Sequence, residues 1–120
     1  MDDLEKTIKK NPLSRENIEL ILKTKVKEVI FWPMIASAAL YFSPILGGYI
    51  IKINSRQTKK EQKIDLIHEI AHIAYNLVDL ETPRHWEELL ERESERFYKE
   101  NKDSINQIYK LAKKWRAHQL

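Results

Sequence analysis

Apolar residues recur at the three- and four-residue spacing of α-helices along most of the chain. Near the N-terminus this pattern predicts a short helix over residues 3–10 and a second helix over about 15–28, with Ser14 as its N-cap. The stretch Val29–Trp32 follows directly. Its β-branched and aromatic residues are as typical of a short strand as of a helix end, so the sequence leaves both open there.

Strand-like patterning is convincing only between residues 38 and 53. The apolar stretches 38–42 and 49–53 flank a segment rich in proline and glycine, which is typical of two strands joined by a turn. In the second stretch Tyr49, Ile51 and Ile53 share one face. The sequence therefore predicts a small α+β domain, mostly helical, with one short antiparallel hairpin packed against the helix that follows it.

The stretch from Thr58 to Leu80 carries the clearest helical signal. Thr58 and Glu61 form a capping box, in which each side chain accepts a hydrogen bond from a free backbone N–H group. Apolar residues form two arcs on opposite sides of this helix, so we expect it to be central and buried. A polar stripe runs between the arcs and should line a cleft; it consists of Glu61, Asp65, His68, Glu69, His72, Asn76 and Asp79.

Two further helices are predicted. The first begins at Thr82-Pro83, with Thr82 as the N-cap and Pro83 in the first helical position, where its missing N–H costs nothing. Its apolar face includes Leu90 and Phe97, and Glu93 falls in the middle of that face, whereas the acids at 91 and 95 are expected to project toward solvent. The last helix begins near residue 103 or 104 and is apolar on one side as far as Trp115.

Composition narrows the possible functions. The 120 residues are enough for one small domain, which we expect to span 1–120. Two glycines are too few for a dinucleotide-binding fingerprint or a phosphate-binding loop. The lack of cysteine excludes disulfides, thiolate metal sites and a cysteine nucleophile. A net charge of +3 is well below that of a dedicated nucleic-acid binder, so no direct binding to nucleic acid is expected.

A membrane segment is also not expected. The stretch Val29–Ile51 has no charged side chain, but Pro33, Pro44 and Gly47-Gly48 divide it into pieces that are each too short to span a bilayer. The N-terminus opens with acidic residues and lacks the apolar region of a secretory signal.

The candidate chemistry lies in the polar stripe, where residues 68–72 read His-Glu-Ile-Ala-His. Residues four apart lie on the same face of a helix, so His68 and His72 can bind one metal ion, as in the H-E-x-x-H motif of zinc hydrolases. A carboxylate on an apolar face is costly to bury without a partner, which favours Glu93 as the third ligand. Glu69 would then act as the general base. The alternative is that the histidines are ordinary polar residues and that Glu93 pairs with an arginine such as Arg84 or Arg96.

The surroundings of these residues suggest supporting roles without deciding them. Asp65 and Asp79 flank the stripe and are candidates for holding a ligand imidazole by its second nitrogen, although a solvated carboxylate is the simpler interpretation of each. The sequence does not identify the group that would stabilise a developing oxyanion.

The strand ending in Ile-Asn, the His-Glu-x-x-His helix and the acidic helix after it resemble the ImmA/IrrE-type zinc metallopeptidases between Tyr49 and Tyr98. The second signature of that family, approximately E-A-x-x-F-A, is similar to the segment from Glu93 to Tyr98, with Glu93 in the place of the zinc ligand. The resemblance implies a zincin-like fold and a cytoplasmic protease that cleaves a helix-turn-helix repressor of a phage or mobile element. It also implies an edge strand that binds substrate, which would be 49–53.

The leading hypothesis is therefore a zinc-dependent endopeptidase that acts on a specific protein partner. It would bind one Zn²⁺ per chain through His68, His72 and Glu93, with Glu69 as the catalytic base. A non-catalytic regulatory module that binds a protein through the same metal-binding fold is the alternative. Chelator-sensitive cleavage of the partner distinguishes the two.

Overall fold

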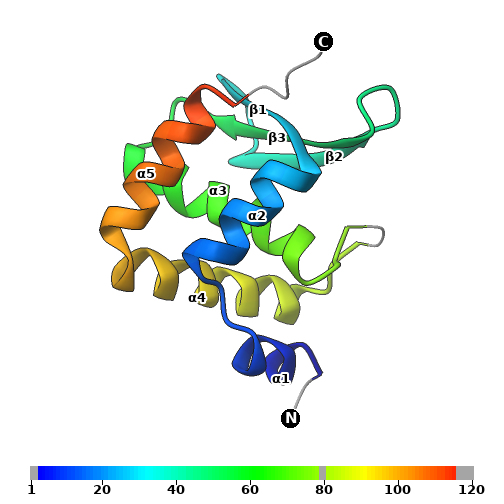
Figure 1. Cartoon of the computed structure of the whole chain (residues 1–120), viewed down its shortest axis with the longest axis vertical. Helices are drawn as coiled ribbons and strands as arrows, with labels where there is room; N and C mark the ends of the chain where they lie inside the picture. The colour runs from blue at the N-terminus through cyan, green and yellow to red at the C-terminus, as the bar shows by residue number, and fades with distance from the viewer. Residues whose placement is uncertain (1–2, 79–80, 116–120) are drawn as a thin grey trace.

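The computed structural model describes residues 3–78 and 81–115. Over these residues the chain forms five helices and a three-stranded sheet (Figure 1). Their order is α1 (Asp3–Lys10), α2 (Arg15–Lys25), β1 (Val26–Trp32), β2 (Ala38–Ser43), β3 (Gly48–Asn54), α3 (Lys59–Ala74), α4 (Arg84–Glu100) and α5 (Lys102–Lys113). This arrangement confirms the predicted small α+β fold.

The sheet has the strand order β1-β3-β2, with β3 parallel to β1 and antiparallel to β2. The hairpin of β2 and β3 confirms the prediction for 38–53. The helix predicted over 15–28 instead ends at Lys25, because Val26–Trp32 pairs with β3 as a strand. Consequently β3 lies in the middle of the sheet, and the expectation that 49–53 forms the edge strand is wrong. The free antiparallel edge belongs to β2.

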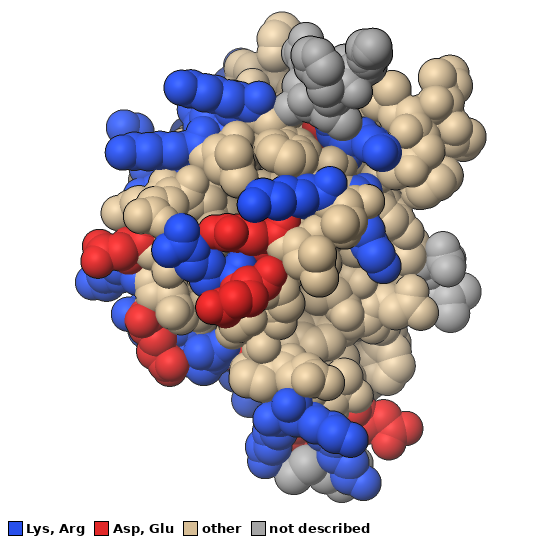
Figure 2. Space-filling model, in the orientation of Figure 1, with Lys and Arg blue, Asp and Glu red and all other residues tan. Residues whose placement is uncertain are grey.

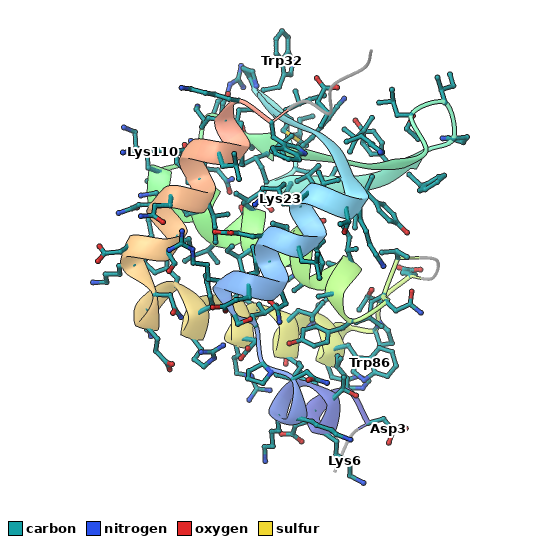
Figure 3. All side chains as sticks on the ribbon, viewed as in Figure 1. Asp3, Lys6, Lys23, Trp32, Trp86 and Lys110 are labelled. Atoms are coloured by element: carbon teal, nitrogen blue, oxygen red, sulfur yellow. The ribbon has the colours of Figure 1, made fainter. Side chains whose placement is uncertain are left out.

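Close packing requires a glycine at position 48, and Trp115 covers the outer edge of β1. A Cβ at Gly48 would lie 2.8 Å from the carbonyl oxygen of Lys25, so only glycine fits where β3 starts beside the end of α2. On the outer side of β1, the Trp115 indole N–H donates to the carbonyl of Val26 at 2.8 Å, and the amide of Val29 donates to the carbonyl of Trp115 at 3.2 Å. Trp32, at the end of β1, projects outward and is 65% exposed (Figure 3).

Helix α3 is the centre of the fold, as its two apolar arcs predict. It contacts β2 and β3 as well as α2, α4 and α5. Ile67 and Ala71 on one arc are fully buried, and so are Leu66 and Ile70 on the other. Only the polar stripe between the arcs is left to face a cleft.

The first residues of α3, α4 and α5 follow the predicted signals to within one or two positions. The Thr58 hydroxyl accepts a hydrogen bond from the backbone N–H of Glu61 at 3.1 Å, so α3 begins where the capping box places it. Helix α4 begins one residue later than predicted, with Pro83 rather than Thr82 at the N-cap and no side-chain capping bond. Helix α5 begins at Lys102, just before the predicted caps.

The surface carries both signs of charge. Figure 2 shows acidic and basic side chains intermixed over the middle of one face, with basic side chains prominent at the end where α1 lies. Within the described ranges, none of the helices combines the length and apolar character needed to cross a membrane.

Candidate metal centre

Helix α3 presents its two histidines to the cleft one turn apart. The rings of His68 and His72 lie with their centroids 5.1 Å apart. His68 is 8% exposed and His72 is partly buried. Because α3 is held on both sides by apolar contacts, these imidazoles project from a rigid support, as a binding site requires.

Helix α4 packs across α3 and brings an acidic residue to both rings. The Glu87 carboxylate lies between them, with Oε1 2.7 Å from His72 Nε2 and Oε2 3.4 Å from His68 Nε2. One ligand atom from each of His68, His72 and Glu87 falls within 4.8 Å of the others. Two histidine nitrogens and a carboxylate oxygen at such distances can share one metal ion.

The opposite nitrogen of each ring is held in place by a separate acceptor. His68 Nδ1 lies 2.8 Å from Glu91 Oε2, and His72 Nδ1 lies 3.0 Å from the carbonyl oxygen of Leu77. Metal-binding histidines usually donate their second N–H to a carboxylate or carbonyl, which leaves the other nitrogen free to bind the metal. Both rings here meet that condition, with Nε2 directed to Glu87.

The Glu87 carboxylate fits a metal better than it fits its protein neighbours. Its Oε1 atom is buried and accepts no hydrogen bond of acceptable geometry within the described residues, although His72 Nε2 is only 2.7 Å away. A buried carboxylate oxygen without a partner is costly. Two electron-pair donors that approach each other without a well-aligned hydrogen are the expected arrangement around a cation. The donor set therefore fits a zinc-type site.

A turn after α3 makes the contact to His72 possible. Asn76 has φ of 57°, the left-handed conformation that asparagine tolerates better than most residues. The amide of Leu77 then donates to the carbonyl of His72 at 2.8 Å, and that of Asn76 donates to Ile73 at 3.1 Å, which is a Schellman motif. The chain reverses there, so α3 ends at Ala74 rather than near Leu80, and the Leu77 carbonyl reaches the imidazole of His72.

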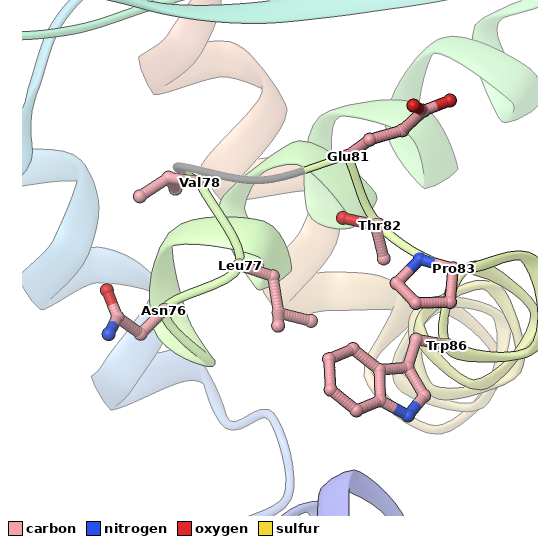
Figure 4. A pocket seen from close by; sticks show the side chains of 7 residues that line it. All are labelled: Asn76, Leu77, Val78, Glu81, Thr82, Pro83 and Trp86. Atoms are coloured by element: carbon pink, nitrogen blue, oxygen red, sulfur yellow. The ribbon is translucent and has the colours of Figure 1, made fainter.

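The cleft itself lies between α3, the start of α4 and the edge strand β2. Glu69, His72 and Glu87 line it together with residues 38–40 of β2, and its volume is about 380 Å³. Leu77, Val78 and Thr82 also line a neighbouring pocket of about 430 Å³, in which Trp86 and Pro83 form an apolar wall (Figure 4). The two hollows are therefore neighbours that share these lining residues.

Glu69 has the protonation properties of a general base in this cleft. Burial raises its pKa from 4.5 to about 7, with smaller contributions from Glu87 and Asp65, while His68 acts in the opposite direction. A carboxyl group with a pKa near neutrality can both accept and release a proton at physiological pH. Glu69, the residue predicted to be the general base, lines the cleft together with His72 and interacts electrostatically with His68.

Comparison with known families agrees with this geometry. The family model of the IrrE N-terminal-like domain, a peptidase family, matches residues 24–114. The chain belongs to this family. The matched region of the IrrE N-terminal-like domain includes the whole sheet, both histidines and Glu87, and it excludes α1 and nearly all of α2. No curated protein and no solved structure gives a significant match.

The third ligand predicted from the sequence must be corrected. Glu93 of this IrrE N-terminal-like domain is buried, but it is not part of the group formed by His68, His72 and Glu87. It accepts a hydrogen bond from the backbone N–H of Leu13 at 2.7 Å and two more from Arg96, at 2.9 and 2.6 Å. The cost of burying Glu93 is thus offset by an arginine and a backbone amide, which is the alternative that the sequence had left open.

The missed signal was the pair of acids at 87 and 91. These residues lie four apart and therefore on the same face of α4. Glu87 contacts the Nε2 atoms of both histidines, and Glu91 contacts Nδ1 of His68. The Glu91 side chain is 42% exposed, as expected for a residue that projects toward solvent, but its carboxylate also contacts His68 Nδ1, which the sequence does not predict. Glu91 also takes the role considered for Asp65, while Asp79, the other candidate, lies outside the described residues.

Proposed function

We propose that this protein is a zinc-dependent endopeptidase that binds one Zn²⁺ through His68, His72 and Glu87. The observation that carries the proposal is the convergence of two Nε2 atoms on the Glu87 carboxylate, whose buried Oε1 atom accepts no hydrogen bond from the described residues. Membership in a peptidase family supports hydrolysis as the reaction. A set of two histidines and one glutamate is the composition of catalytic zinc sites, which leave a position open.

When bound, zinc would polarise the scissile carbonyl and lower the pKa of the attacking water to about 7. The protein side chains supply the rest. Glu69, which lines the cleft, accepts a proton from the water as the water oxygen bonds to the carbonyl carbon. Glu69 then delivers the proton to the amine nitrogen as the carbon–nitrogen bond breaks.

The proposed substrate lies extended along β2. This strand has one edge without a strand partner among the described residues, and its residues 38–40 line the cleft opposite Glu69 and Glu87. A peptide that adds to a free edge gains backbone hydrogen bonds and presents alternate side chains to the pockets beside it. The substrate strand expected at 49–53 is thereby reassigned to 38–43.

For the identity of the substrate, we propose a protein partner, and specifically a cytoplasmic helix-turn-helix repressor of a phage or mobile element. This part rests on the resemblance of residues 49–98 to ImmA/IrrE-type peptidases. A protein partner also suits an edge strand and a cleft that is open to extended chains.

The test compares the zinc-loaded protein with its Glu69→Gln variant on a peptide library derived from a bacterial proteome, with new termini identified by mass spectrometry. We expect cleavage by the wild type that stops with a chelator and returns with zinc. The variant should bind zinc but produce no new termini. Equal products from both proteins, or none from either despite bound zinc, would contradict the proposed hydrolysis and favour the non-catalytic binding module.

A further inference from the structure

We infer that Glu91 is the positioning residue that prepares His68 to bind metal, and that α4 supplies a metal ligand and the support of a second ligand from a single face. This inference rests on the metal site proposed above. It assigns to Glu91 a function that depends on its contact with a histidine rather than on any contact with substrate.

The geometry of the contact carries the inference. Glu91 Oε2 lies 2.8 Å from His68 Nδ1, within normal hydrogen-bond distance. The His68 side chain is only 11% exposed, whereas that of Glu91 is 42% exposed. The imidazole therefore has little access to water as an alternative partner, while the carboxylate can be removed without opening the core.

The two histidines are supported in different ways. His72 Nδ1 is bonded to a backbone carbonyl, which any residue at position 77 would supply in the same turn. His68 Nδ1 is bonded to a side chain, so its support depends on the residue type at 91. Which ring nitrogen carries the proton is set by the hydrogen bond that the other nitrogen makes. An acceptor on Nδ1 keeps the proton there and leaves the Nε2 electron pair available.

Helical spacing places Glu87 and Glu91 on the same face of α4, beside the same histidine. Glu87 contacts the Nε2 atoms of both rings, and Glu91 follows one turn later on the same helix. Removing Glu91 leaves Glu87 as the carboxylate in contact with His68 among the described residues, at 3.4 Å from its Nε2. Asp65 and Glu69 also interact with His68 electrostatically. We then expect the ring to move its proton to Nε2, where Glu87 can accept a hydrogen bond. That tautomer cannot bind a metal through Nε2.

The consequence is a loss of metal affinity. Mutation of the partner that holds a ligating histidine typically weakens metal binding by about 10- to 100-fold. Glu91→Ala should show a loss in this range. Glu91→Gln should recover most of it, because the amide oxygen can still accept a hydrogen bond from Nδ1.

The experiment measures Zn²⁺ affinity by competition with a chromophoric chelator, and the His68 tautomer by nitrogen-15 NMR of the zinc-free protein at pH 8. Glu95→Ala is the matched control, because Glu95 lies one turn further along α4 and lines, together with Glu91, a hollow beside Thr58 and Asp65 at the start of α3. Among the contacts of the described residues, Glu95 has none with either histidine. Melting curves confirm that each variant is folded.

We expect weaker zinc binding and a proton on His68 Nε2 for Glu91→Ala alone. Wild-type affinity in Glu91→Ala, or an unchanged His68 tautomer in that variant, would overturn the role of Glu91. A wild-type protein that binds no zinc would instead refute the proposed metal site, and the NMR comparison would still decide what Glu91 does to His68.

Discussion

Replacing Glu93 with alanine should destabilise the fold and leave zinc binding intact. Glu93 is 7% exposed and joins the segment between α1 and α2 to the back of α4. Its carboxylate accepts from the Leu13 amide and from the Arg96 guanidinium, and Arg96 in turn donates to the carbonyl of Leu13 at 2.9 Å. Both backbone groups of one residue are thus held by this ion pair.

The expected loss of stability is estimated from the polar groups that Glu93→Ala leaves without their partner. The Leu13 amide would be buried without an acceptor, which costs about 2 kcal/mol. Arg96 is 32% exposed and keeps its hydrogen bonds to Leu13 and Glu100. Water can therefore replace most of its interaction with Glu93, and we assign about 1 kcal/mol to the loss of that ion pair. The expected loss of stability is therefore about 3 kcal/mol, or roughly 10 °C in Tm for a domain of this size.

The assay is urea unfolding of the zinc-free protein followed by circular dichroism, together with zinc titration of the folded variant. Glu88→Ala is the control, since Glu88 lies on the same helix with a side chain that is 62% exposed and should shift stability by less than about 0.5 kcal/mol. If Glu93→Ala lost zinc with unchanged stability, Glu93 would be a ligand and the contacts to Leu13 and Arg96 would not describe its role.

Variants at two other positions, Glu69 and Asn76, test the surroundings of the site. Between pH 4.5 and 7 the contribution of Glu69 to the stability of the zinc-free protein should fall as pH rises, because folding favours protonated Glu69, whose pKa is raised from 4.5 to about 7. In Glu69→Gln the Tm should therefore fall less, or rise more, over this pH range than in the wild type, and an identical dependence of Tm on pH would contradict the raised pKa. Asn76→Val should lower Tm and weaken zinc binding, because a β-branched residue is strained at φ of 57° and the turn carries the Leu77 carbonyl to His72. Asn76→Gly should retain both properties, and equal losses in the two variants would show that the side chain of Asn76 matters rather than its backbone conformation.

The sequence predicts the central part of this fold because the relevant signals are local. The capping residue Thr58 and two apolar arcs define α3, and the turn between 42 and 49 defines the hairpin. The sequence predicts helix for the first residues of β1 and leaves only Val29–Trp32 open, because the partner of this strand is not local: Val26–Trp32 pairs in parallel with β3 some twenty residues later. That pairing also determines which strand is the edge, so the substrate strand was assigned to the wrong side of the hairpin.

In the candidate site too, the sequence predicts residues that are close together along the chain but not contacts between distant segments. His68, Glu69 and His72 could be found because helical spacing alone places them together. Burial of Glu93 was also predicted correctly, but the sequence does not show which group offsets its cost. Arg96, one of the arginines that the sequence offers as a partner, donates two hydrogen bonds to Glu93, and a backbone amide eighty positions earlier, at Leu13, donates the third. Choosing Glu87 instead requires the packing of α4 on α3, which no local pattern contains.

The central claim is that Glu87, with His68 and His72, holds one zinc ion. Zinc content of purified protein after zinc addition and dialysis tests it directly, in wild type, Glu87→Ala and the Glu88→Ala control. The account predicts one zinc per chain in the wild type and the control, and little or none in Glu87→Ala. Full zinc content in Glu87→Ala, or none in the wild type, would contradict it.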